Sequence, residues 1–156
     1  MIKNQLVFAL LFFVSLNFFP QKMDKTKKEI LESVESHKEE IISISDKIWR
    51  LAETSFEEFE SSKLLSDYAE KNGFAVEKGV AGMPTAFVAT YGEGKPVISV
   101  LGEFDALPGL SQDISPEKKP LVIGGNGHGC GHNMFGAASL ASAIAIKEQI
   151  EKGGLK

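Results

Sequence analysis

The stretch 124–133 reads GGNGHGCGHN and places two of the three histidines and the only cysteine of the chain within ten positions, five of which are glycine. Thiolate and imidazole groups are ligands that suit zinc and related divalent ions. His128, Cys130 and His132 alternate with glycines, so in an extended conformation their side chains project to the same side. Ordering such a loop is entropically costly, and metal binding would offset that cost. This Gly–His–Cys loop (residues 124–133) therefore predicts metal ligation.

Phosphate binding is a second chemistry that a glycine-rich loop before a helix can perform. The required spacings are absent, because no three glycines fit G-x-G-x-x-G. Gly131 and Gly136 have the separation of a P-loop, but Ala137 stands where that motif requires lysine. The loop therefore does not indicate a nucleotide site.

A cysteine nucleophile is a third possibility. Cys130 comes just before a predicted helix, whose N-terminal dipole would favour the thiolate. A histidine two positions away is poorly placed to act as its base, since catalytic cysteine and histidine usually come from distant parts of a chain. Alternatively, the glycines form a tight turn around a buried Cys130 that neither binds metal nor acts as a nucleophile.

Carboxylates follow the most apolar predicted strand. In VISVLGEFDALPGL, Glu103 and Asp105 stand where the strand ends, and Pro108-Gly109 then turns the chain. Ligands of open α/β sheets collect beyond the carboxyl ends of strands. A carboxylate there can bind a metal or hold a ligating imidazole in one tautomer. Alternatively, Asp105 merely caps the turn.

Hydrophobic periodicity predicts two helices in the first half of the chain. Between Lys25 and Ala52, apolar residues recur every three, four or seven positions, which is typical of one helix face. His37 lies among polar residues of this segment, so we expect it to be solvated. Ser55 and Glu58 have the spacing of a capping box, which predicts that a second helix begins there.

The rest of the pattern predicts strands and a final helix, and hence an α/β fold. The second helix should end at Asn72-Gly73, and an extended stretch should begin at Phe74. We then expect a strand over 85–91 and a central, covered strand over 96–103. After a polar loop to about Pro120, an alanine-rich helix should follow, which Asn133 caps and which ends at Gly153-Gly154.

The first 21 residues predict a signal peptide. Lys3 precedes about fourteen nearly unbroken apolar residues, a length that suits a signal-peptide core and is short for a membrane span. We expect export to the periplasm or the cell exterior, with no stable membrane association after cleavage. An uncleaved N-terminal anchor is the alternative. An exported free thiol needs protection from oxidation, which metal coordination would provide.

Composition limits the classes of partner. The 156 residues carry a formal net charge of -4 and are 43% hydrophobic, enough for one core of ordinary size. Without a run of lysine or arginine, the chain offers no basic surface for nucleic acid. We therefore expect a small-molecule substrate and no nucleic-acid partner. The single cysteine excludes an internal disulfide.

LGEFDALPGLSQ and GHGCGHNMFGAA together resemble the metal-dependent amidohydrolases of the aminoacylase and carboxypeptidase superfamily, and most of all its aminobenzoyl-glutamate utilisation branch. The similarity continues backward through WRLAETSFEEFESS and GVAGMPTAFVATYGEGKPVISV, so it covers roughly residues 40–156. It implies that residues 22–156 are the N-terminal part of a three-layer α/β/α, zinc-peptidase-like catalytic domain, truncated in this chain.

The resemblance also implies roles for individual residues. Cys130 and His132 match metal ligands, and Asp105 matches the acidic catalytic residue that orients the site. His128 matches a histidine that is common at this position in relatives, and Asn133 matches an asparagine of the aminobenzoyl-glutamate branch where many relatives have aspartate. Together with Glu103, which stands at the strand end, these residues could support the site or contact substrate. The implied cofactor is a divalent metal, zinc or manganese, with two ions in full-length relatives.

The implied activity is metal-dependent hydrolysis of the amide bond of N-acyl amino acids or aminobenzoyl-glutamate-like substrates. Full-length relatives dimerise and carry further ligands and a glutamate pair that supplies the general base, none of which is found in this chain. We therefore expect an inactive N-terminal fragment. A non-catalytic remnant that binds metal weakly, and a cysteine-nucleophile hydrolase, are the alternatives.

Overall fold

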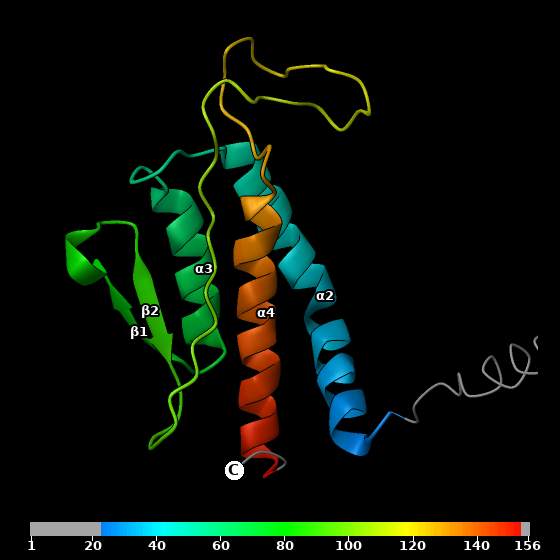
Figure 1. Cartoon of the computed structure of the whole chain (residues 1–156), viewed down its shortest axis with the longest axis vertical. Coiled ribbons are helices and arrows are strands. Elements are labelled where there is room, and N and C mark those ends of the chain that lie inside the picture. Colours follow the sequence, from blue (N-terminus) through cyan, green and yellow to red (C-terminus); the bar gives the residue numbers. More distant parts are fainter. Residues whose placement is uncertain (1–22, 154–156) are drawn as a thin grey trace, which may run out of the picture.

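The computed structural model describes residues 23–153, which form three helices and one small sheet (Figure 1). The elements are α2 (Lys25–Leu51), α3 (Phe59–Lys71), β1 (Ala75–Lys78), the 3-10 turn η1 (Val80–Gly82), β2 (Phe87–Thr90) and α4 (His132–Glu151). The predicted α/β class is confirmed as a partial domain of mixed helix and sheet.

The predicted signal peptide, residues 1–21, lies outside the described residues. Within residues 23–153, no helix combines the length and the apolar character that crossing a membrane requires.

The long helix α2 confirms the prediction from its apolar period. Asp24 caps its start, because the side chain accepts a hydrogen bond from the backbone N–H of Lys27 at 2.9 Å. Ala52 ends it in the left-handed conformation, with φ of 47°, and donates its N–H to the carbonyl of Ile48. The apolar face between these ends packs against α4, and this places the last turn of α2 beside the start of α4 (Figure 1).

The core lies where α2, α3 and α4 meet. Ile48 of α2, Leu65 of α3 and Ile144 of α4 are each exposed by 1% or less. The antiparallel hairpin β1–β2 packs beside α3, in a register that pairs Ala75 with Thr90 and Lys78 with Phe87 (Figure 1). Burial of such aliphatic side chains stabilises the fold by about 1.5–3 kcal/mol each.

The prediction of a central, covered strand over 96–103 is wrong for the described residues. The segment is extended and runs alongside α4, but it pairs with no strand there. Val97, Ile98 and Leu101 are 80%, 82% and 73% exposed. β-Branched residues fit a strand only when neighbouring strands supply hydrogen bonds and covering side chains, and residues 23–153 place neither beside this segment.

The predicted capping box at Ser55 and Glu58 is also wrong. The side chain of Glu58 accepts from Thr85 Oγ1 at 2.5 Å instead of returning to the backbone. Glu53 performs the capping from outside the helix: its carboxylate accepts from the backbone N–H groups of Glu60 and Ser61, at 3.1 and 2.8 Å. An anion at this end also complements the helix dipole.

His37 is not solvated as predicted; it connects the three helices. Its Nδ1 lies 2.7 Å from the hydroxyl of Tyr68 on α3, and its Nε2 lies 2.9 Å from Glu148 Oε1 on α4. The ring therefore donates from Nε2 to the carboxylate and accepts at Nδ1 from the phenol. The polar sequence around His37 concealed this role, since the two partners come from distant helices.

The contact with His37 gives a pH prediction. The hydrogen bond from His37, which outweighs burial, lowers the pKa of Glu148. A lowered folded-state pKa contributes stability above the ordinary glutamate pKa, and this is lost as the pH falls through the folded-state value. Glu148→Gln should therefore cost about 1 kcal/mol at neutral pH and progressively less in acid.

Thermal unfolding followed by circular dichroism between about pH 3 and pH 7 measures this difference. Glu39→Gln, which removes an exposed carboxylate of α2, is the matched control and should show no such convergence. A constant gap between wild type and Glu148→Gln at every pH would contradict the assignment.

Candidate metal centre

Three chain segments meet at the end of the extended segment. Thr54, in the loop after α2, forms a parallel bridge with Ala106, whose N–H donates to the carbonyl of Glu53 at 2.7 Å. Leu107 forms an antiparallel bridge with Gly127 of the Gly–His–Cys loop. These bridges bring together the strand-end carboxylates, the loop after α2 and the start of α4.

His132 is the centre of the candidate site. Its Nδ1 donates to Asp105 Oδ1 at 2.7 Å, and its Nε2 lies 3.1 Å from Glu103 Oε2. Ser55 donates to the other oxygen of Asp105 at 3.2 Å, a contact that its predicted capping role did not anticipate. The side chains of His132 and Asp105 are 18% and 21% exposed, so the pair is shielded yet reachable from solvent.

Electrostatics favour the ionised form of Asp105. Burial, the largest single influence, raises the pKa of this carboxyl, but the hydrogen bonds from His132 and Ser55, together with a backbone hydrogen bond and the charge of His132, lower it overall. An ionised Asp105 accepts the Nδ1 proton of His132 and so fixes the orientation of the ring, with Nε2 directed toward Glu103.

The loop that delivers Ser55 is conformationally strained. Ala52 and Phe56, on either side of Ser55, have φ values of 47° and 67°, in the left-handed region that residues with a Cβ rarely adopt. Such residues cost about 1–3 kcal/mol each and persist only where the surroundings hold them. Here Glu53 holds the loop in place: its carboxylate accepts a hydrogen bond from Ser61 at the start of α3, and its backbone carbonyl accepts one from the N–H of Ala106.

Cys130 lies in a turn, so the predicted extended arrangement of three ligands is wrong. The N–H of Gly131 donates to the carbonyl of His128 at 3.0 Å, and Gly131, with φ of 78°, is the N-cap residue of α4. The turn leaves Cys130 exposed two positions from His132, which also excludes the alternative of a buried cysteine.

His128 contacts the end of α2 and is not part of the Asp105–His132 pair. Its Nε2 donates to the carbonyl of Ile48 at 3.0 Å, and its Nδ1 is buried with no partner among the described residues. Burial lowers the pKa of His128 more than the hydrogen bond to Ile48 raises it, so the ring is neutral at neutral pH. It attaches the Gly–His–Cys loop to the end of α2.

The prediction that Asn133 caps α4 is wrong, because Gly131 is the N-cap residue. Asn133 lies inside the helix, 8% exposed, and its Nδ2 donates to Ser45 Oγ of α2 at 3.0 Å. Because Gly131 is the N-cap residue, the side-chain amide of Asn133 is not needed as a cap and instead connects α4 with α2.

The donor set fits one part of a metal site. Among residues 23–153, no group of three or more His, Cys, Asp or Glu side chains is placed to hold an ion. The Asp105–His132 pair nevertheless has the arrangement of a metal-ligating imidazole oriented by a carboxylate. Cys130 offers a thiol nearby in sequence and open to solvent.

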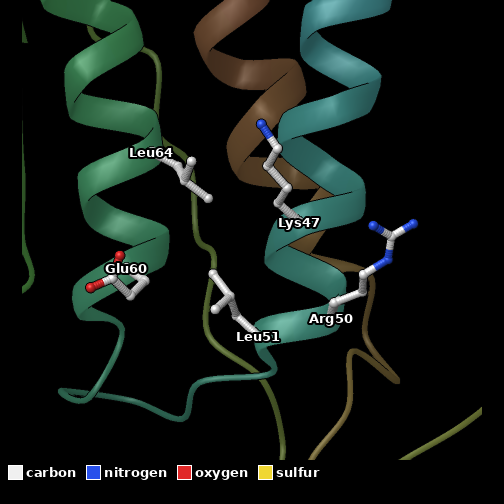
Figure 2. Close-up of a pocket in the computed structure, with 5 residues that line it drawn as sticks. All are labelled: Lys47, Arg50, Leu51, Glu60 and Leu64. Atoms are coloured by element: carbon white, nitrogen blue, oxygen red, sulfur yellow. The ribbon is translucent and has the colours of Figure 1, made fainter.

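A separate pocket of about 340 Å³ lies between α2 and α3, lined by Lys47, Arg50, Leu51, Glu60 and Leu64 (Figure 2). Figure 2 shows Leu51 and Leu64 pointing into the space between the helices, and Arg50 pointing away from α3. None of the predicted site residues lines this pocket, so it is not the predicted centre.

Two glycines of the Gly–His–Cys loop lie close to Leu110, and this contact gives a second prediction. A Cβ on Gly127 would lie 2.1 Å from the carbonyl oxygen of Leu110, a backbone atom that cannot easily move. Gly129 is the matched control, since its Cβ would meet the flexible end of the Leu110 side chain at 2.6 Å.

Gly127→Ala should therefore lower the free energy of unfolding by about 2–3 kcal/mol and Gly129→Ala by clearly less. Urea unfolding followed by circular dichroism measures both. Equal losses in the two variants would show that the backbone contact does not set the requirement for glycine.

Known proteins resemble the whole of this region. No family model matches the chain. One subunit of the p-aminobenzoyl-glutamate hydrolase of Escherichia coli K12 is 44% identical over 133 residues, which is 85% of this chain and 28% of that protein. Thermostable carboxypeptidase 1 of Saccharolobus solfataricus is 36% identical over 68% of this chain and 27% of its own length. Xaa-Arg dipeptidase of mouse is 25% identical over 83% and 29%.

The chain thus spans less than a third of the length of these relatives. All three are named for the hydrolysis of peptides or related amides, and the first carries the aminobenzoyl-glutamate name that the motifs indicated. The resemblance is confirmed: the chain is similar in sequence to amidohydrolases and peptidases, among them a subunit of the p-aminobenzoyl-glutamate hydrolase of E. coli.

Proposed function

We propose that this chain supplies part of the metal centre of an amidohydrolase that cleaves N-acyl amino acids or aminobenzoyl-glutamate-like amides. The observation that carries the proposal is the 2.7 Å contact between Asp105 and His132 at the first residue of α4. The 44% identity to a p-aminobenzoyl-glutamate hydrolase supports the substrate class.

In this proposal Cys130 and His132 hold a zinc or manganese ion, one of two in the complete enzyme. When bound, such an ion polarises an amide carbonyl and lowers the pKa of water. Asp105 keeps the Nδ1 proton on His132, so that Nε2 faces the ion. Binding releases the thiol proton of Cys130, since the thiolate is the ligand.

Glu103 and His128 have supporting roles in the proposal. Glu103 is half-exposed beside His132 Nε2, where it can bind the ion or hold a water or substrate N–H. His128 positions the loop through Ile48 rather than binding metal, because its Nε2 is occupied by that carbonyl. Asn133 stabilises the start of α4 against α2 without adding negative charge.

We propose further that residues 1–156 alone do not turn over substrate, because residues 23–153 assemble no group of three metal-ligating side chains. The complete protein would be exported and would assemble from more than one subunit. The apolar N-terminal segment supports export, and the name of the bacterial relative, which is that of a subunit, is consistent with assembly.

The metal proposal predicts a specific loss of binding. Cys130→Ser and His132→Ala should abolish most zinc uptake, and Asp105→Asn should weaken it by about 10- to 100-fold, since the carboxylate acts through the imidazole. Equilibrium dialysis followed by mass-spectrometric metal analysis gives the stoichiometry and the affinity.

His37→Gln is the matched control, because His37 binds Tyr68 and Glu148 far from the loop. It should keep wild-type zinc binding. Unchanged stoichiometry in Cys130→Ser and His132→Ala would refute the metal centre, provided that circular dichroism shows both variants folded.

A chimera tests the activity. Residues 24–156 replace the matching segment of the E. coli relative, and hydrolysis of p-aminobenzoyl-glutamate is measured with a chelator or with a thiol-alkylating reagent. We expect turnover that the chelator abolishes and that falls by a factor of about 100 or more in Asp105→Ala. The 156-residue chain alone should be inactive.

Three outcomes separate the competing functions. Turnover that survives chelation but not alkylation would identify a cysteine nucleophile at Cys130. A folded chimera without turnover would identify a non-catalytic remnant. Turnover by the 156-residue chain itself would contradict the proposal that it lacks essential groups.

A further inference from the structure

Asp105 is held through both of its carboxylate oxygens. Its Oδ1 accepts from His132 Nδ1 at 2.7 Å, and its Oδ2 accepts from Ser55 Oγ at 3.2 Å. The torsion that rotates an aspartate carboxylate is broad and only weakly restricted by itself. Donors on the two different oxygens restrict this rotation, so the hydroxyl of Ser55 completes what the imidazole alone leaves open.

Backbone pairing places the hydroxyl of Ser55 beside this carboxylate. Ser55 and Asp105 are 50 positions apart in the chain. Thr54, directly before Ser55, forms a parallel bridge with Ala106, directly after Asp105. The N–H of Ala106 also donates to the carbonyl of Glu53 at 2.7 Å. The contact between the two side chains is therefore supported by the main chain of both segments.

The loop that carries Ser55 is also fixed from the side of α3. The carboxylate of Glu53 accepts from the N–H and from the hydroxyl of Ser61, at 2.8 and 2.7 Å. Ala52 and Phe56, on either side of Ser55, keep left-handed φ values of 47° and 67°. Strain of this kind persists only where the surroundings hold it, and it gathers at sites that need a fixed geometry. These anchors keep the hydroxyl of Ser55 in one place.

A hydroxyl suits this task because it is a neutral donor. A lysine or arginine at the same place would also hold the carboxylate. Its positive charge, however, would compensate the charge of Asp105 and repel a divalent ion bound at the imidazole. Ser55 orients Asp105 and leaves the negative charge of the carboxylate to His132.

We propose that Ser55 is a positioning residue of the metal centre and acts through Asp105 on the direction of His132 Nε2. This inference rests on the proposed function, in which His132 binds the ion. The hydroxyl needs no contact with the ion or the substrate in this role. It fixes the carboxylate, and the carboxylate fixes the imidazole, so that less rotamer freedom is lost when the imidazole becomes a ligand.

Titration of the full chain with cobalt(II) measures the effect on metal binding. Cobalt is a spectroscopic substitute for zinc, and its absorption reports thiolate and imidazole ligands. Ser55→Ala should weaken cobalt binding by roughly three- to tenfold, the effect of about one intramolecular hydrogen bond. Ser55→Thr keeps a hydroxyl and should recover most of the affinity. Ser142→Ala is the matched control, because the hydroxyl that it removes bonds within α4 to the carbonyl of Ala138.

A double-mutant cycle tests whether Ser55 acts through Asp105. In the Asp105→Ala background, Ser55→Ala should cause no further loss of cobalt affinity, because the acceptor of its hydrogen bond is already absent. A residue that merely stabilises the loop would lower the affinity by the same factor in both backgrounds. Circular dichroism checks that each variant is folded.

NMR of the metal-free chain separates this proposal from the metal centre itself. The hydrogen bond to Asp105 protects the Nδ1 proton of His132, and the exchange of this proton with water is followed in a chain with isotope-labelled histidine. Ser55→Ala should accelerate the exchange by roughly three- to tenfold, whereas Ser55→Thr should leave it close to the wild-type rate.

The outcomes distinguish the two proposals. Cobalt binding that Cys130→Ser abolishes and Ser55→Ala leaves unchanged would overturn the positioning role and keep the metal centre. Equal losses with and without the Asp105 carboxylate, or a loss that Ser55→Thr does not recover, would also overturn that role. A wild-type chain that binds no cobalt, although Ser55→Ala still accelerates proton exchange, would refute the metal centre and leave Ser55 as a residue that orients the Asp105–His132 pair.

Discussion

The carbonyl oxygen of Ile48 connects the helical core with the candidate site. The Ile48 side chain is fully buried between α2, α3 and α4, so its backbone position is set by the packing of the core. The same carbonyl accepts from Ala52, which ends α2, and from His128 at 3.0 Å. The turn that follows His128 then starts α4 and delivers His132 to Asp105. The position of the imidazole thus depends on the packing of the helices as well as on the loop.

Short-range patterns allowed most of the fold to be predicted. The period of α2, the break at Asn72-Gly73 and the alanine-rich α4 are properties of neighbouring residues, and the structure confirms them. The segment 96–103 differed because a strand is completed by partners from elsewhere in a sheet, and the described residues supply none. Ser55 and Glu58 differed because Glu53 caps α3 through space, which spacing alone does not reveal.

The candidate site shows the same division. The association of Asp105 with His132 agrees with the expectation that a carboxylate at the end of an apolar strand can hold a ligating imidazole. The directions of His128 and Cys130 did not follow, since one left-handed residue, Gly131, reverses the chain between Cys130 and His132. Whether a glycine adopts an extended or a left-handed conformation depends on its surroundings, because both are sterically open to it.

The contact between Asp105 and His132 also closes a loop, since the two residues are 27 positions apart. The outer part of that loop extends away from the helices (Figure 1), and Gln112 and Lys119 bind within it rather than to the core. Because the entropy of closing a loop grows only slowly, by about 0.6 kcal/mol for each doubling of length, the outer part can change in length at little thermodynamic cost. Related proteins are therefore free to vary the rim of this site while the imidazole and its carboxylate stay in register.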